Sequence, residues 1–167
     1  MPLPGETAAP ADFIETPRNP ALKQLFAYWT AKRGVRAVPA RADINPSEIK
    51  PLLPDVMIWK AEASGGPYTI RLVGERIVRF VGRNNTGASA TLGMPEAAAA
   101  AMNAVLAQVV TSGRPLFRIG KAYWLAEKSY RDFEACYLPL SSDGGAVDMI
   151  LGGVTFDAAM ARSAAAG

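Results

Sequence analysis

The sequence contains no histidine and a single cysteine, Cys136, among its 167 residues. Without histidine the chain cannot build a Ser-His-Asp or Cys-His catalytic site, and it lacks the commonest metal ligand. A zinc or iron–sulfur site has almost nothing to be built from, and haem ligation would depend on methionine or cysteine. One cysteine also cannot form an intramolecular disulfide, which fits a reducing cytoplasm. We therefore expect a cytoplasmic protein with no enzyme activity and no bound metal.

The sequence also lacks long apolar runs and a strong charge of either sign. The alanine-rich stretch 97–110 is interrupted by Asn103 and Gln108, and it is too short to span a bilayer. The first residues contain neither a basic nor an apolar signal region, which predicts no secretory leader. The formal net charge is only +3, a weak argument for nucleic-acid binding. We expect neither a membrane nor a nucleic acid as a partner.

Half of the residues are hydrophobic, which is enough for one sizeable core. The proline-rich residues 1–19 predict a flexible N-terminal segment, and the alanine-rich residues 158–167 predict a frayed tail. Residues 20–157 are expected to form a single domain.

Helical and strand periods alternate along this domain. Helices are expected over 20–34 and 95–113, and a short helix is expected after Gly74, where the apolar residues change to helical spacing. Alternating segments predict strands over 56–63, 68–73, 115–125, 130–140 and 147–156. Two strands, then helices, then three strands predict an α+β fold. Its five-stranded antiparallel sheet has helices packed on one face, with an additional N-terminal helix.

Four segments occur in collinear order over about residues 22–157: "LFAYWTAKRG", "DINPSEIKPLLPDVMIW", "YTIRLVGERIVRFVGRNNTG" and "FEACYLPL". In these segments the sequence resembles the alphaproteobacterial PAS-like family of small stand-alone proteins (PAS family 5). The resemblance implies a PAS fold. Such folds serve as ligand sensors, redox or light sensors and docking modules, so the fold alone does not fix the function.

Several apolar residues are expected to point between the sheet and the helices. They could line a small apolar cavity, or they could form an ordinary filled core. A one-residue slip of any strand would exchange its two faces. The cavity candidates are Met57, Trp59, Tyr68, Ile70, Leu72, Ile77, Val78, Val81, Phe133 and Tyr137.

Two charged residues lie inside apolar strands, Arg71 and Glu134. They could be solvated on an open sheet face, or they could form a pair that meets across the sheet or anchors an acidic ligand group, because arginine presents a planar fork of donors. Cys136 is either an inert buried thiol or the carrier of a redox or flavin signal.

Two further groups of side chains can each be interpreted either as functional or as structural. The aromatic residues Trp59, Tyr123 and Trp124 could stack on a flat ligand or belong to the core. A basic set could bind an anion or form a solvated surface: Arg76, Arg79, Arg83, Arg118 and Lys121.

The sequence is compatible with three functions. The first is a sensory or regulatory domain that binds a small ligand of unknown identity and signals to a partner protein. The second is a ligand-free protein–protein interaction module, and the third, least supported, is an enzyme with an unrecognised pocket. The apolar stripe of the first helix predicts a homodimer, although the same stripe could instead cover the chain's own sheet. Its members are Leu22, Leu25, Phe26 and Trp29.

Overall fold

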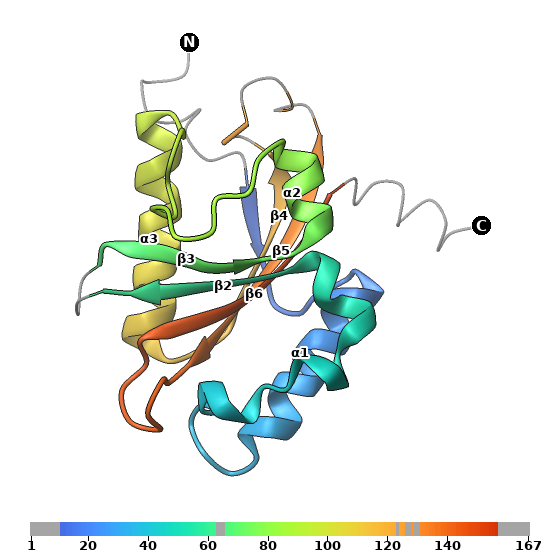
Figure 1. The fold of residues 1–167 in the computed structure, drawn as a ribbon, viewed down its shortest axis with the longest axis vertical. Coiled ribbons are helices and arrows are strands. Elements are labelled where there is room, and N and C mark those ends of the chain that lie inside the picture. Colours follow the sequence, from blue (N-terminus) through green and yellow to red (C-terminus); the bar gives the residue numbers. More distant parts are fainter. Residues whose placement is uncertain (1–10, 63–65, 123, 126–127, 129–130, 157–167) are drawn as a thin grey trace.

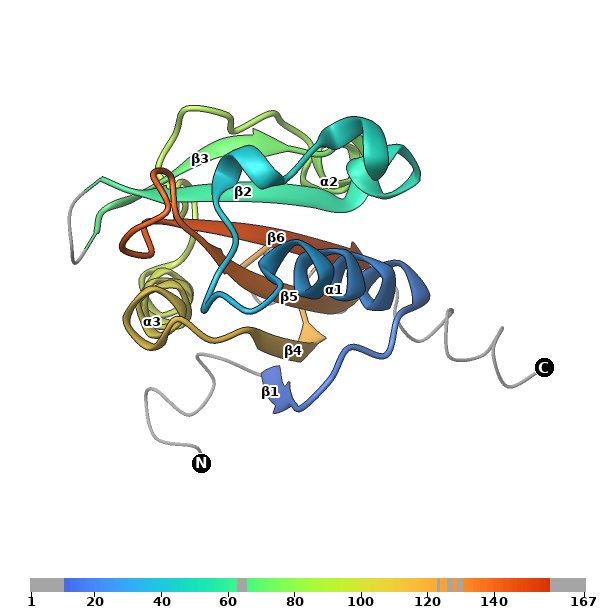
Figure 2. The ribbon, with the colours of Figure 1, turned by 90° about the horizontal axis from the view of Figure 1, so that it is seen from below.

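An antiparallel sheet of six strands, in the order β1-β4-β5-β6-β2-β3, organises the fold (Figure 2). The computed structural model describes residues 11–62, 66–122, 124–125, 128 and 131–156. The strands are β1 (Ala11–Ile14), β2 (Val56–Ala61), β3 (Tyr68–Val73), β4 (Leu116–Lys121), β5 (Asp132–Leu140) and β6 (Met149–Phe156). As predicted, the first hairpin joins the last three strands, because β2 pairs with β6 from Val56 opposite Gly153 to Lys60 opposite Met149.

Within the described residues, three α-helices surround the sheet: α1 (Pro20–Arg33), α2 (Glu75–Val81) and α3 (Glu96–Ser112) (Figure 1). Short 3-10 helices lie between α1 and β2: η1 (Arg41–Asp43), η2 (Pro46–Glu48) and η3 (Lys50–Asp55). The start of α1 is fixed by Asn19, whose side-chain oxygen accepts a hydrogen bond from the backbone N–H of Ala21 at 2.8 Å. Gly34 ends the helix with a φ of 58°, a conformation that favours glycine. No helix of the described residues has the length and apolar character needed to cross a membrane.

The sheet has one strand more than the five predicted, and the additional strand lies in the segment predicted to be flexible. Residues Ala11–Ile14 pair with β4, from Ala11 opposite Gly120 to Ile14 opposite Phe117. Four residues among prolines carry little local strand signal, and their pairing partner lies far along the chain. The strand is therefore defined by this long-range pairing, and sequence periodicity alone did not reveal it. Residues 1–10 and 157–167, which include the predicted tail, lie outside the described part of the chain.

Helices cover both faces of the sheet, which corrects the prediction of a single covered face. Strand β5 shows the reason, since its alternate side chains are apolar on both sides and almost all buried. Phe133, Ala135 and Tyr137 belong to the core beneath α3, whereas Cys136 and Leu138 belong to the core beneath α1. A strand that is apolar on both faces needs a cover on each.

The predicted dimer stripe of α1 belongs to the core on the second face. Leu22, Leu25 and Trp29 are 1, 1 and 2% exposed. The indole N–H of Trp29 donates to the backbone carbonyl of Pro139 at 2.8 Å, and the half-buried Phe26 packs edge-on against Phe117 with ring centroids 5.0 Å apart. The chain's own sheet thus covers the stripe, which makes it unsuitable as a dimer interface. The homodimer itself remains a prediction, and this stripe does not provide its interface.

Two adjacent glycines at the centre of β6 allow both layers to approach the sheet closely. A Cβ atom on Gly152 would collide with the indole ring of Trp59, on the α3 face. A Cβ atom on Gly153 would lie 2.6 Å from Leu22 Cδ2 and 2.9 Å from Leu25 Cδ2, on the α1 face. Glycine in a strand often marks such a close approach. Successive residues of one strand therefore support the two opposite layers.

Candidate functional site

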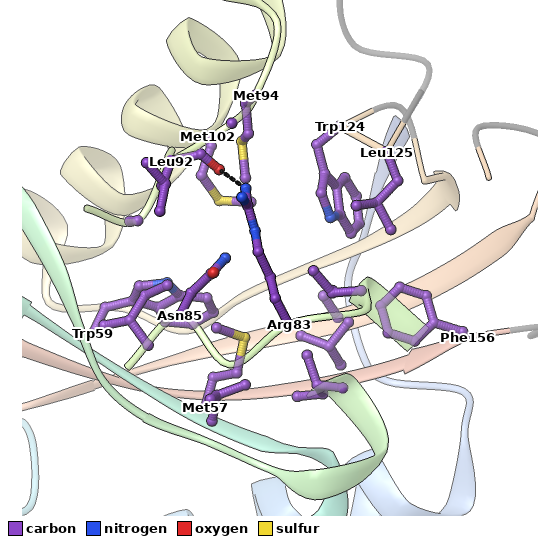
Figure 3. Close-up of a pocket in the computed structure, with 18 of the residues that line it drawn as sticks. Met57, Trp59, Arg83, Asn85, Leu92, Met94, Met102, Trp124, Leu125 and Phe156 are labelled. Atoms are coloured by element: carbon purple, nitrogen blue, oxygen red, sulfur yellow. Dashed lines mark hydrogen bonds between the residues drawn. The ribbon is translucent and has the colours of Figure 1, made fainter. Parts of the chain in front are cut away.

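A cavity opens between the α3 face of the sheet, helices α2 and α3, and the loop 82–95 (Figure 3). The space that the centre of a water molecule can occupy is about 90 Å³. Since roughly 10–15 Å³ of such space holds one water, the cavity is large enough for a small organic molecule. The sheet contributes Met57, Trp59, Ile70, Val73, Ala135, Tyr137, Val154 and Phe156 to its lining. The remaining lining residues are Ile77, Val81, Arg83, Asn85, Ala90, Leu92, Gly93, Met94, Met102, Trp124 and Leu125.

Aromatic rings contribute to the lining of this cavity. Trp59 and Tyr137 are stacked with ring centroids 5.6 Å apart and an interplanar angle of 27°. Trp124 is packed edge-on against Phe133 at 4.7 Å. Such planar apolar walls suit contact with a flat or compact apolar ligand. Of the three aromatic residues considered for stacking, Trp59 and Trp124 line the cavity, and Tyr123 lies outside the described residues.

The structure brings six of the ten predicted cavity residues together in the lining: Met57, Trp59, Ile70, Ile77, Val81 and Tyr137. Tyr68 and Phe133 are buried in the same core without lining the cavity. Val78 follows Ile77 on α2 and is turned away from the lining, because successive helix residues point in directions about 100° apart. Leu72 is on the other face of the sheet, where it packs against the core beneath α1.

A β-bulge explains the position of Leu72. Trp59 is opposite Ile70, and Ile58 is opposite Leu72, which leaves Arg71 as an extra residue of β3. An extra residue inverts the alternation of the strand beyond it. Val73, rather than Leu72, therefore lines the cavity.

The two predicted polar anchors do not meet, and neither lines the cavity. Arg71 is exposed and forms an ion pair with Glu62 at 3.5 Å. Glu134 is 2% exposed on the α1 face, where its carboxylate accepts hydrogen bonds from the backbone N–H of Arg18 at 2.7 Å and of Asn19 at 3.0 Å. Strands β6 and β2 separate β5 from β3. The structure therefore does not form an Arg71–Glu134 pair, and the solvated alternative holds for Arg71 alone, because Glu134 is buried against a segment more than a hundred residues earlier in the chain.

Four of the five residues of the predicted basic set do not line the cavity, although Arg118 contacts a residue that does. Arg118 is buried and donates from Nη2 to the hydroxyl of Tyr137 at 2.7 Å. The others form ion pairs, Arg76 with Asp55, Arg79 with Glu75, and Lys121 with Asp132. Arg83 alone of this set lines the cavity. The set therefore does not form one anion-binding patch.

Sequence reasoning missed the contribution of the loop 82–95, which joins α2 to α3. The loop is fixed along the edge of β3 by three backbone hydrogen bonds, including Ala90 N to the carbonyl of Tyr68 at 2.9 Å. Ala90, Leu92 and Met94 then line the cavity. Their alternate spacing within the loop was the signal that could have revealed them.

Cys136 is fully buried on the face opposite the cavity. Burial raises the pKa of its thiol to about 12, which suppresses the reactive thiolate at neutral pH. A ligand in the cavity would not reach this sulfur, so the interpretation of Cys136 as an inert buried thiol fits the structure.

A family model described as a PAS domain matches residues 18–155. The chain belongs to the PAS domain family. No curated protein matches it. The PAS assignment marks a sensory, regulatory or interaction module, a class that is generally non-catalytic.

The described residues of this PAS domain contain no group of three or more histidine, cysteine, aspartate or glutamate side chains placed to hold a metal ion. What the site offers instead is an apolar space with a few polar side chains at its opening, including Arg83 and Asn85 (Figure 3). That arrangement is suited to binding and offers no convergent acid–base pair.

Proposed function

We propose that this PAS domain is a sensory or regulatory module that binds a small molecule in the cavity and signals its occupancy to a partner protein. The observation that carries the proposal is the cavity itself, about 90 Å³ in size and lined by aromatic and aliphatic side chains. Protein cores are normally packed with few voids larger than a water molecule. A space of this size between the sheet and its helices favours an occupant over an ordinary filled core.

The composition of the lining supports binding of a ligand of irregular shape. Met57, Met94 and Met102 reach the cavity from a strand, a loop and a helix (Figure 3). Methionine side chains are unbranched and flexible, so they can adjust to different apolar surfaces. The rigid Trp59–Tyr137 stack would hold one side of the ligand while these side chains adapt to the other.

Occupancy would be communicated by the elements that close the cavity from outside the sheet. Helix α2 has only seven residues and contributes Ile77 and Val81 to the lining. Short helices depend on packing for their stability, so a ligand that contacts these two side chains would change the stability and position of α2. The exposed side of α2 and the loop 82–95 are then the surfaces that a partner protein would recognise.

Native mass spectrometry of the purified chain tests the proposal by detecting a retained small molecule. In parallel, a fragment library is screened by ligand-observed NMR against the wild type and Ala135→Leu, which fills the wall of the cavity. Val35→Ser, at a fully exposed position, is the matched control. We expect hits that Ala135→Leu abolishes and Val35→Ser retains. If no compound is retained and no hit depends on Ala135, the ligand proposal fails and a ligand-free interaction module is favoured.

A further inference from the structure

Arg83 lies across the opening of the cavity (Figure 3). Gly82 ends α2 in the left-handed conformation, with a φ of 94°, and this turn sends the next residue toward the loop that follows. The guanidinium Nη2 of Arg83 donates to the carbonyl of Leu92 at 3.2 Å. It also lies against Gly93, where a Cβ atom would collide with it. The loop thus holds the guanidinium at the cavity without a counter-charge.

The electrostatic setting of Arg83 differs from that of its neighbours on α2. Arg76 and Arg79 each form an ion pair with a carboxylate. Among the described residues, Arg83 has no carboxylate within ion-pair distance, and its one hydrogen bond goes to a neutral carbonyl. A guanidinium offers five N–H donors in a planar fork, so that bond uses a small part of its capacity.

The composition of the cavity lining also leaves Arg83 without a counter-charge. Among the described residues that line the cavity, none is acidic and only Arg83 is charged. Asn85 lies beside Arg83 at the same opening, with its amide group directed toward it (Figure 3). The remainder of the lining is mostly aliphatic, aromatic or methionine. An apolar space with one cation and one amide at its mouth matches a molecule that is apolar at one end and anionic at the other.

We propose that the ligand is a compact organic monocarboxylate, whose apolar body fills the cavity and whose carboxylate binds Arg83. This inference rests on the proposed ligand-binding function. The carboxylate replaces the carbonyl of Leu92 as the partner of the guanidinium and accepts two parallel N–H bonds, the geometry that arginine favours. Asn85 donates a further hydrogen bond from its amide. A single guanidinium neutralises one negative charge, which favours a carboxylate over a phosphate ester.

The exchange has a structural consequence for the loop. The Arg83–Leu92 hydrogen bond ties the end of α2 to the loop 82–95 across the opening. When a carboxylate takes this donor, the tie is released and the ligand itself links the two segments. Binding of the acid would therefore alter the same α2 and loop surfaces that the proposed function assigns to signalling.

The test compares acids with neutral molecules of the same shape. The probes are benzoate, phenylacetate, indole-3-acetate and hexanoate, each paired with its primary amide, and inorganic phosphate serves as a probe of charge alone. Dissociation constants are measured by ligand-observed NMR and calorimetry for the wild type, Arg83→Gln and Ala135→Leu. Arg79→Gln, on the adjoining helix α2 and 75% exposed in its side chain, is the matched charge control. If Ala135→Leu does not fold, Ala90→Leu replaces it.

We expect at least one acid to bind about tenfold or more tightly than its amide, the scale of a hydrogen bond to a charged group. Arg83→Gln should remove that preference, Arg79→Gln should retain it, and Ala135→Leu should abolish binding of both forms. Arg83→Lys keeps the charge without the planar fork and should give an intermediate loss.

Three results would overturn the inference, in distinguishable ways. If acids and amides bind equally and Ala135→Leu abolishes both, the ligand-binding function stands and the role of Arg83 is wrong. If phosphate binds as well as the acids and Ala135→Leu has no effect, Arg83 is a non-specific anion contact outside the cavity. If none of the acids binds, the inference is contradicted, whereas the proposed function is decided separately by the retained compound and the fragment screen.

Discussion

Glu134 Oε2 lies 3.0 Å from the backbone nitrogen of Asn19, the residue that caps α1. The same oxygen accepts from the backbone N–H of Arg18 at 2.7 Å. A carboxylate at the start of a helix satisfies free N–H groups and interacts favourably with the helix dipole. This buried glutamate therefore attaches the first helix to the central strand of the sheet, a role that its position inside an apolar strand did not suggest.

Replacing Glu134 by glutamine should lower the free energy of unfolding by about 1–3 kcal/mol. Glutamine retains the shape of the side chain but loses the charge that strengthens the two hydrogen bonds to the chain before α1. Urea unfolding followed by circular dichroism measures the change. Glu75→Gln is the control, because the side chain of Glu75 is 70% exposed and its loss should change stability by no more than about 0.5 kcal/mol. Equal stability of Glu134→Gln and wild type would contradict the attachment.

Alanine at Gly152 should disturb the wall of the cavity, whereas alanine at Gly153 should disturb the α1 layer. Each new Cβ would enter space occupied by a packed side chain, Trp59 in the first case and Leu22 in the second. Overpacking of this kind costs about 1–3 kcal/mol. Fluorine NMR of protein labelled with 5-fluorotryptophan separates the two effects, since each tryptophan gives its own resonance.

In that experiment Gly152→Ala should shift the resonance of Trp59 most strongly, and Gly153→Ala should act on Trp29 of the α1 core. Each resonance is assigned with a tryptophan-to-phenylalanine variant. If both alanine variants shift the same tryptophan equally, the glycine pair does not separate the two layers.

The thiol of Cys136 should be unreactive toward iodoacetamide at pH 8 in the native protein and should react on unfolding in guanidinium chloride. Burial removes access and raises the pKa of the thiol to about 12, compared with 9.0 for the unperturbed group. Mass spectrometry of the alkylated protein measures the reacted fraction. Rapid alkylation of the native protein would show that the α1 layer opens readily.

The same pKa shift predicts a dependence of stability on alkaline pH. A thiol that stays protonated in the folded state contributes its full stability below pH 9. Between about pH 9 and pH 12 the unfolded chain loses this proton first, so the free energy of unfolding should fall as the pH rises. Cys136→Ala removes this contribution, and its stability should fall less steeply over the same range. Identical pH profiles would contradict the shift.

Helix α1 should behave as part of the core. Trp29→Phe removes the hydrogen bond to Pro139 and should cost about 1–3 kcal/mol of unfolding free energy, whereas Gln24→Ala on the exposed side of the helix should be nearly neutral. Deletion of residues 1–34 would expose the apolar side chains of Phe117, Leu138 and Leu151 to water. We expect the truncated chain to lose its cooperative unfolding transition. A folded truncated protein would show that α1 is dispensable.

Much of the fold followed from local patterns in the sequence. The helical spacing of Leu22, Leu25 and Trp29 predicted α1, and the alternation of residues 68–72 predicted β3. The change of period after Gly74 predicted the short α2. These elements depend on neighbours a few residues apart, and the sequence contains that information directly. Six of the ten residues predicted to face a cavity do line it.

The tertiary structure decided which face each strand presents and which side chains meet. Periodicity fixes an alternation but not its phase, so the bulge at Arg71 moved Leu72 away from the cavity and brought Val73 to it. The partners of Glu134 lie more than a hundred positions earlier in the chain, and β1 is defined by a strand equally distant from it. Arg83 lies at the cavity because backbone hydrogen bonds fix its loop along the edge strand β3 and its guanidinium bonds to the carbonyl of Leu92. Local spacing thus determined the elements, whereas long-range hydrogen bonding and packing determined the cavity, because those contacts form only when distant segments of the chain come together.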